Sequence, residues 1–552
     1  MTGPIFAFSK ITNYAAMAVG ALSLLVVAGV ATELPPARFT SPVAYNSGGG
    51  GAEAVAVADV NRDGIPDLVV ALQCPGEYDG GCTTSGGKIG VMLGNGDGTF
   101  QSAMIFSSGG ATADSIAVAD VNGDGIPDVV VANYCESSAG CPYDYGADGP
   151  GSVSILLGNG DGTFQFPISY SSGGWNADSV SVADVNGDGI PDLIVSNACE
   201  TGACSNGEIG LGTVAVLIGN GDGSFQAAVS YASGGWVAAA VVTADVNGDG
   251  KPDLVVANQC LTVQSRYFPT CNPDGVVGVL FGNGDGTFQP PVTYNSGGVA
   301  ASSVVVADVN GDGHPDLVVS NPCGYAPSCE DSVSVLAGNG DGTFQDPVTY
   351  SEKGWGIATV AVADVNGDGY PDLAVSAFCP EAGTCGGENG LVRVFLGNGD
   401  GTFQVPPLRY NSGAVWTEAV TMADVNGDQR PDLVAASICG GPGCIHGTLA
   451  VFLNETYFVT STALTASPNS SKVNQQVTLT CTLSSHLKIP DGELVTFYDG
   501  KQILGTRAVY QGSASLTTSF ARAGSNIIKA SYPGDPWHKA SSATVRQSVI
   551  QP

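Results

Sequence analysis

Positive charge is scarce in this chain. Its 552 residues include 18 Lys and Arg against 51 Asp and Glu, which gives a formal net charge of −33. Nucleic-acid phosphates require cations that so acidic a protein lacks, and anionic membrane surfaces repel it. We therefore expect no nucleic-acid partner and no docking on a membrane surface, and we expect divalent cations to supply the countercharge.

Catalytic motifs are scarce as well. The four His residues are scattered along the chain, and no G-x-S-x-G elbow, Cys/His pair or zinc motif is present. The sequence therefore predicts that the protein is not an enzyme. The alternative is a carbohydrate-active enzyme of the polysaccharide-lyase kind, because a pair of carboxylates for such chemistry could lie among the many acids.

Long apolar runs are absent except near the N-terminus. Residues 15–31 form an apolar stretch that follows Lys10 and ends in small residues, as a secretory signal does. A run of this length could also serve as a marginal membrane anchor. We expect residues 1–31 to be a signal peptide and the protein to be secreted or held at the cell surface, with a retained anchor as the alternative.

A repeat dominates what the sequence does contain. The motif D-x-N-x-D-x-x-P-D recurs at intervals of roughly 60 residues, which is typical of a repeat architecture. The seven copies begin at Asp59, Asp120, Asp184, Asp245, Asp308, Asp364 and Asp424.

Each repeat is predicted to form four antiparallel strands. In the second repeat, the β-branched stretches SIAVADV and DVVVAN flank the acidic loop, as in a hairpin. A second hairpin follows, because GSVSILLGNGDGTF carries Asn-Gly and Asp-Gly turn signals before QFPISYSSGG. Four such strands make a propeller blade. The predicted fold is therefore all-β, a seven-bladed β-propeller of four-stranded antiparallel blades.

The last repeat lacks its fourth strand. The turn GNGDG[TS]F ends the third strand in the first six repeats, and VFLNET replaces it in the seventh. A match for the missing strand lies at the other end of the chain, where ARFTSPVAYNSGG (37–49) resembles GTFQPPVTYNSGG (286–298). We expect residues 38–47 to complete the last blade and remove the exposed edges of the array. The propeller would then span residues 32–458.

The acidic loops are predicted to bind calcium. Ca²⁺ takes six to eight oxygen ligands, and three carboxylates in one turn repel each other unless an ion lies between them. Side chains at loop positions one, three, five and nine and the carbonyl at position seven would supply the oxygens, while the alternative is an acidic turn without metal. The ligands expected for up to seven structural ions are Asp59, Asn61, Asp63, Ile65, Asp67, Asp120, Asn122, Asp124, Ile126, Asp128, Asp184, Asn186, Asp188, Ile190, Asp192, Asp245, Asn247, Asp249, Lys251, Asp253, Asp308, Asn310, Asp312, His314, Asp316, Asp364, Asn366, Asp368, Tyr370, Asp372, Asp424, Asn426, Asp428, Arg430 and Asp432.

Two loops depart from the common pattern. In the seventh loop Gln429 replaces a glycine, and a side chain there is unfavourable if φ is positive. In the first loop Arg62 replaces another glycine. We expect the site that begins at Asp424 to be the weakest. The GNGDG turns carry single acids such as Asp97 and Asp161, and we expect them to be turns rather than metal sites.

Cysteines indicate the compartment. Fourteen of the 15 fall into close pairs, one per repeat, and disulfides in an oxidising space explain this better than zinc or buried free thiols. Cys481 is left over and is expected to lie reduced in a strand. The pairs are Cys74/Cys82, Cys135/Cys141, Cys199/Cys204, Cys260/Cys271, Cys323/Cys329, Cys379/Cys385 and Cys439/Cys444.

These repeats resemble the FG-GAP/VCBS type and are similar to the seven-bladed propeller at the head of integrin α subunits, over residues 38–458. Residues 460–552 resemble a bacterial Ig-like domain, because TLTCTL, GELVTFYDG, SASLTTSF and NIIKASYPGD alternate as sandwich strands do. The resemblance implies an Ig-like β-sandwich after the propeller, which would act as a spacer. It does not specify an activity, since one fold hosts many functions.

Recognition is expected on the face that carries the cysteine-bearing loops and the links between blades, here called the disulfide-loop face. Its sequence varies most between repeats, and variable loops on a rigid scaffold are common binding sites. Trp175, Trp236, Trp355 and Trp416 lie in the links, either packed between blades or available to a ligand. We expect a monomeric adhesion or recognition module for a protein or glycan. The alternatives are the lyase-like enzyme and a structural surface component.

Overall fold

The structure is a computed structural model that describes residues 37–74, 86–136, 149–200, 210–260, 275–322, 331–352, 355–379, 390–440, 446–485 and 487–551. Every regular element in these ranges is a strand. Accordingly, the described residues contain no helix with the length and apolar character that crossing a membrane would take. The apolar run at residues 15–31 lies outside them, so the signal peptide stays a prediction.

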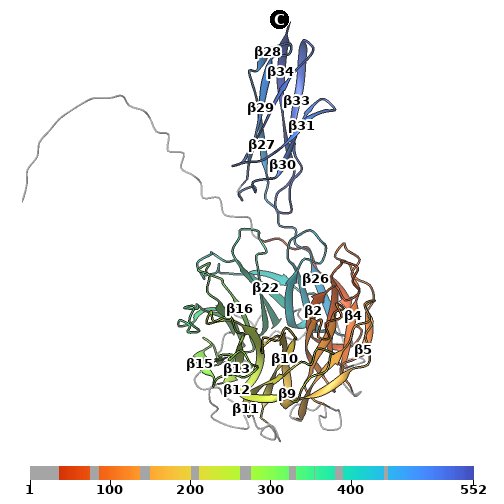
Figure 1. Cartoon of the computed structure of the whole chain (residues 1–552), viewed down its shortest axis with the longest axis vertical. Coiled ribbons are helices and arrows are strands. Elements are labelled where there is room, and N and C mark those ends of the chain that lie inside the picture. The colour runs from red at the N-terminus through yellow and green to blue at the C-terminus, as the bar shows by residue number, and fades with distance from the viewer. Residues whose placement is uncertain are drawn as a thin grey trace, which may run out of the picture. The chain divides into compact units, whose positions relative to one another are not determined.

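Strands β1–β26 build a seven-bladed propeller, as the sequence predicts (Figure 1). They are β1 (Val43–Asn46), β2 (Gly50–Ala58), β3 (Asp67–Cys74), β4 (Lys88–Met92), β5 (Met104–Ser107), β6 (Ala113–Ala119), β7 (Asp128–Asn133), β8 (Pro150–Leu156), β9 (Ile168–Ala183), β10 (Asp192–Cys199), β11 (Leu211–Leu217), β12 (Val229–Ala244), β13 (Asp253–Cys260), β14 (Val276–Leu280), β15 (Val292–Asn295), β16 (Ser303–Ala307), β17 (Asp316–Asn321), β18 (Asp331–Leu336), β19 (Val348–Glu352), β20 (Trp355–Ala363), β21 (Asp372–Cys379), β22 (Leu391–Phe395), β23 (Leu408–Asn411), β24 (Val415–Ala423), β25 (Asp432–Cys439) and β26 (Thr448–Phe452).

Three of the blades share strands. The long strands β9 and β12 each begin as the outer strand of one blade and continue as the inner strand of the next. Blades two, three and four therefore form one ten-stranded sheet, whereas the other four blades are separate four-stranded sheets. The inner strands contact their counterparts in neighbouring blades, and β2 contacts both β6 and β24, which closes the ring.

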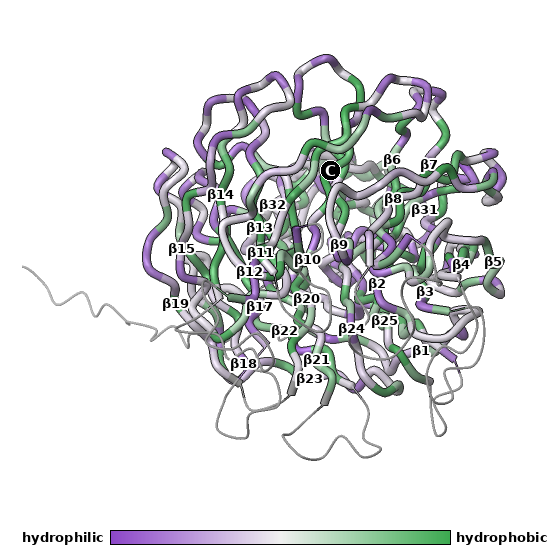
Figure 2. Tube along the Cα trace, turned by 90° about the horizontal axis from the view of Figure 1, so that it is seen from below, coloured by the Kyte–Doolittle hydropathy of each residue, from purple (hydrophilic) through white to green (hydrophobic). Residues whose placement is uncertain are grey.

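The hydrophobic core lies between the blades. The second strand of each blade is apolar on both faces because both faces are covered, as in β3, where Leu68, Val69 and Val70 are fully buried. Leu68 and Val70 pack with Val434 and Ala436 of the last blade. Figure 2 shows the result, with hydrophobic stretches along the strands and hydrophilic residues in the turns.

The seventh blade contains the N-terminal strand. β1 pairs antiparallel with β26 in the sheet order β1-β26-β25-β24, with Val43 opposite Val451. Phe39 forms a bridge with Asn454 and packs edge-on against Tyr410 at a centroid distance of 5.2 Å. Equivalent Tyr–Phe or Phe–Phe contacts, such as Tyr170–Phe225 at 5.9 Å, lie at the other junctions. Phe39 thus takes the place of the phenylalanine that the seventh repeat lacks. The first and seventh blades are neighbours, and Figure 1 shows β2 of the first beside β26 of the seventh.

The C-terminal strands form two facing sheets. One has the order β27-β29-β32 and the other β28-β34-β33-β30-β31. Val477, Phe497 and Tyr532 are fully buried between them, and Cys481 is free and buried, as expected. The strands are β27 (Ser461–Ser467), β28 (Ser470–Lys472), β29 (Gln476–Ser484), β30 (Leu494–Asp499), β31 (Gln502–Ala508), β32 (Ser513–Ser519), β33 (Gly524–Tyr532) and β34 (Ser541–Ile550).

Candidate metal-binding loops and recognition face

The seven acidic loops join the first and second strands of each blade and fold around their own side chains. In the second loop, Asp120 accepts hydrogen bonds from the amides of Gly123 (2.7 Å) and Gly125 (2.8 Å). Asn122 accepts one from the amide of Asp124 at 2.9 Å. The bond from the sixth residue of the loop to the first Asp recurs in all seven loops. Positions one, three and five are therefore held close together.

The ninth position has a structural role as well. One oxygen of Asp128 accepts from the amide of Val121 at 3.0 Å, and the other accepts from Gly158 at 2.8 Å. The same two bonds recur at every ninth-position Asp. Hydrogen bonds to a charged acceptor contribute about 1.5–3 kcal/mol each. This carboxylate therefore joins the acidic loop to the end of the third strand.

Burial is the main influence on these ninth-position carboxyls. It raises the pKa of Asp67, Asp128, Asp192, Asp253 and Asp316, and the negative charges at positions five and one raise it further. Burial likewise raises the pKa of Asp372 and of Asp432, each to about 7. A cation at these loops would remove the repulsion that contributes to these shifts.

The loops offer the donors that calcium prefers, since carboxylate, amide and carbonyl oxygens are hard ligands. Among the described residues, however, no three His, Cys, Asp or Glu side chains converge as they would around an ion. The carboxylates instead accept hydrogen bonds from the loop's own amides. The donor set fits calcium, and the predicted ligand geometry stays a prediction.

The first and seventh loops hold side chains in left-handed backbone. Arg62 has φ 65° and Gln429 has φ 67°, at positions where other loops have glycine. In the seventh loop the side chain of Arg430 also binds Asp428 and donates to the carbonyl of Thr456 at 3.0 Å. The loop therefore contains its own cation, which sequence reasoning considered only as a carbonyl position.

The GNGDG turns use their acids internally, as the turn interpretation predicts. Asp97 accepts from the amide of Thr99 at 3.0 Å and from its hydroxyl, and these bonds lower the pKa of Asp97. The turn ends in a bridge between Gly94 and Phe100. The other five turns repeat this arrangement, ending at Phe164, Phe225, Phe288, Phe344 and Phe403.

Sequence reasoning missed four acids on the inner strands, here called the hub carboxyls: Glu53, Asp114, Asp178 and Glu418. Each precedes the first Asp of its acidic loop by six residues, so this common offset was the available signal. Burial raises the pKa of all four, and repulsion from Glu53 adds to the shift at Asp114 and Glu418. The equivalent residues in the remaining blades are Ala239, Ser302 and Ala358.

The disulfide-loop face is described only in part. Cys74, Cys135, Cys199, Cys260 and Cys439 are disulfide-bonded, but their expected partners lie outside the described residues. Trp175 packs against Ala198 and Cys199, which agrees with packing between elements. Trp416 lies one position further along its blade, and 36% of it is exposed. Its φ of 57° belongs to the common frame of the blades, because Asn176 and Val237 hold the same position with φ 56° and 57°.

The repeats match a known family. Residues 81–131, 145–195, 204–256, 269–319, 325–375 and 383–435, more than half of the chain, match the FG-GAP-like repeat. The chain belongs to the FG-GAP-like repeat family. Four segments of this FG-GAP protein also match the FG-GAP repeat, and residues 464–550 match the bacterial Ig-like domain (group 3).

Proteins of several kinds are similar to parts of this chain. Phosphatidylinositol-glycan-specific phospholipase D of Rattus norvegicus is 31% identical over 196 residues, which cover 31% of this chain and 21% of that protein. Integrin alpha-PS5 of Drosophila melanogaster is 31% identical over 203 residues, covering 34% of this chain and 19% of the integrin. An exotype rhamnogalacturonan lyase structure aligns with TM-score 0.41 and 12% identity over 75% of each chain. This chain spans about a fifth of the length of these curated relatives.

Proposed function

We propose that this FG-GAP protein is an exported, calcium-stabilised recognition module that binds a protein or glycan through its disulfide-loop face. The observation that carries the proposal is the recurrence of one oxygen-rich loop in all seven blades, folded so that positions one, three and five lie together. Similarity of the repeats to integrin α subunits supports an extracellular location.

Calcium would be held by the residues at positions one, three, five, seven and nine. When bound, it would supply the countercharge that these carboxylates lack. Extracellular modules bind calcium with dissociation constants on the order of 10⁻⁴–10⁻³ M. Calcium at a hundredfold excess over its dissociation constant stabilises a folded protein by about 2.7 kcal/mol per site.

Calorimetry tests this part of the proposal. The melting temperature of the whole protein should rise as calcium is added to chelator-treated protein, and magnesium should be less effective because it demands a smaller, more rigid octahedron. A melting temperature that does not change with calcium would rule out stabilisation by the ion.

The recognition role is tested by arrays of glycans and of extracellular proteins, each probed with and without chelator. The matched variant is Trp416→Gly, because Gly51 and Gly356 hold the equivalent position with φ 65° and 72°. It removes an exposed side chain without adding strain. Binding that depends on calcium and falls in this variant supports the proposal, whereas binding that the variant leaves unchanged places recognition elsewhere.

An enzyme function is the second candidate. The chain is related to a phospholipase D over 31% of its own length, which covers only 21% of that enzyme. The lyase-like alternative is tested by incubating the protein with polysaccharides and assaying for new chain ends. Cleavage of any substrate would favour the enzyme, whereas calcium-dependent self-association would favour a structural surface component.

A further inference from the structure

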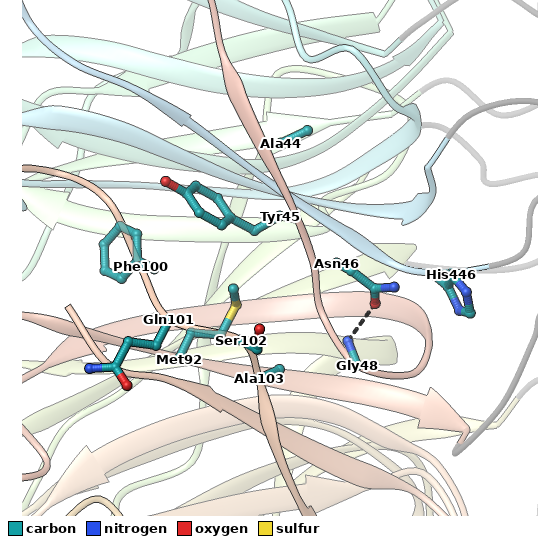
Figure 3. Close-up of a pocket in the computed structure, with 10 residues that line it drawn as sticks. All are labelled: Ala44, Tyr45, Asn46, Gly48, Met92, Phe100, Gln101, Ser102, Ala103 and His446. Atoms are coloured by element: carbon teal, nitrogen blue, oxygen red, sulfur yellow. Dashed lines mark hydrogen bonds between the residues drawn. The ribbon is translucent and has the colours of Figure 1, made fainter. Parts of the chain in front are cut away.

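A pocket lies between the seventh and first blades and reaches the link between β1 and β2 at Gly48. It has a volume of about 420 Å³ and lies between the latch strand β1 of the seventh blade and the turn that enters β5 of the first (Figure 3). Its floor is apolar, with Met92 and Phe100 largely buried. Tyr45 packs edge-on against Phe100 at 5.7 Å. Both walls come from the first 103 residues, and His446 is the lining residue from the last repeat. Because β1 is held in place by its pairing with β26, the pocket forms when the ring closes.

The open volume follows from small side chains. At the next junction between blades, Ile105, Phe166 and Pro167 stand where this pocket has Ala44, Ser102 and Ala103. The aromatic contact is the same at both, since Phe106 packs on Phe164 at 5.6 Å. The pocket therefore results from local sequence changes on a common frame.

The polar side chains at the pocket are the carboxamides of Asn46 and Gln101, the hydroxyls of Tyr45 and Ser102, and the imidazole of His446. The carboxamide oxygen of Asn46 accepts from the amide of Gly48 at 2.8 Å. Its nitrogen lies on the side toward His446, as Figure 3 shows. Gln101 and Ser102 are exposed on the opposite wall. Among the residues that the structure describes, no Asp, Glu, Lys or Arg lines the pocket.

We propose that this pocket binds one or two rings of a neutral carbohydrate. A sugar ring has an apolar face for the Tyr45, Phe100 and Met92 surface, and its hydroxyls pair with amide and hydroxyl groups. The volume lies within the range of small-molecule sites, about 300–1,000 Å³. Anionic sugars are disfavoured, because the chain carries a net charge of −33 and the described lining residues include no Lys or Arg to pair with them. This inference goes beyond the proposed function, because it assigns a ligand class to one pocket at the edge of the disulfide-loop face and does not depend on Trp416.

Saturation-transfer NMR on the whole protein tests it. The probes are methyl β-D-glucopyranoside, methyl β-D-galactopyranoside, methyl α-D-mannopyranoside, D-glucuronate and the neutral peptide N-acetylalanine methylamide. We expect at least one neutral glycoside to bind saturably in the millimolar range, with no signal from glucuronate. Absence of binding by all three glycosides, or stronger binding of glucuronate or of the peptide, would overturn the proposal.

Variants taken from other repeats locate the binding. Ala44→Ile with Ala103→Pro introduces the residues of the next junction, so the fold should tolerate both changes, and binding should be lost. Gln101→Ala should weaken binding several-fold, and Gln165→Ala, the same change at the next junction, should not. Binding that survives the double variant with an unchanged melting temperature would disprove this location. Trp416→Gly should leave glycoside binding unchanged, which separates this test from that of the disulfide-loop face.

Discussion

The second and seventh acidic loops share the hydrogen bonds to their first Asp but differ in charge. In the second, glycine occupies both left-handed positions and Ile126 stands at position seven, so the carboxylates have only neutral donors nearby. In the seventh, Gln429 takes a strained conformation, and Arg430 places a guanidinium on Asp428. In the proposed function an external cation would balance the charge of the second loop, whereas the seventh loop contains a guanidinium of its own. The blades differ too, because the seventh is assembled from both ends of the chain.

The largest loss of stability should come from removing β1, the N-terminal strand that completes the seventh blade. Deletion of residues 32–50 removes β1 and Phe39, leaves the outer edge of β26 unpaired and exposes the aromatic face of Tyr410. We expect a loss of several kcal/mol and a drop in melting temperature on the order of 10 °C or more, because an entire strand with its buried contacts is lost. Thermal denaturation of the truncated protein measures this, and Phe39→Ala is a milder version. A melting temperature equal to that of the full chain would show that β1 does not hold the ring closed.

The second-largest effect should be a difference between the calcium responses of the second and seventh loops. Asp124→Asn removes one proposed calcium ligand, so the calcium-dependent rise in melting temperature should be smaller. The expected loss of stability is that of one calcium site, about 2.7 kcal/mol when the ion is at a hundredfold excess over its dissociation constant. Asp428→Asn should leave that rise unchanged and instead lower the stability without calcium, since Arg430 loses its partner. Paired calorimetric titrations make the measurement. Equal calcium responses of the two variants would contradict the distinction between the loops.

A third prediction is that two substitutions in the seventh loop increase its response to calcium. Gln429→Gly with Arg430→Ile gives the seventh loop the sequence of the second, and it relieves left-handed strain of about 1 kcal/mol. The calcium-dependent rise should exceed that of the parent, because an internal cation has been replaced by a free site. Gln429→Gly alone is the control, and it should recover stability with little added response to calcium. If the double variant responds to calcium as the parent does, Arg430 is not what sets this loop apart.

The smallest change in stability is expected at the hub carboxyls, where the second and seventh blades should respond alike to substitution. Asp114 and Glu418 have pKa values raised by burial and by Glu53. A folded-state pKa above the unfolded value gives stability that is present at low pH and is lost as the pH rises through the folded pKa. Asp114→Asn and Glu418→Gln should each raise the melting temperature by a few degrees at pH 8, with the difference vanishing near pH 4. Destabilisation at pH 8 would contradict this account.

Features that repeat were predictable from sequence, and features made by single residues were not. Period, strand signals and turn chemistry predict the propeller, because each blade is locally specified by motifs such as GNGDG. The hub carboxyls required knowledge of which strand lies innermost, and the cation in the seventh loop required the reach of one side chain, Arg430. The ion sites themselves stay predictions, since spacing specifies donors but not their convergence.

The pairing of Val43 with Val451 also has a kinetic consequence. Contacts between residues this distant in sequence form slowly, because the closure of a long loop costs entropy before any contact compensates it. A growing chain releases β1 first and its partner β26 only after six other blades have been made. A chain that stops early keeps an unpaired first strand and an open inner surface. Synthesis of β26 is therefore the step after which the ring can close, while strands β27–β34 are still to be made.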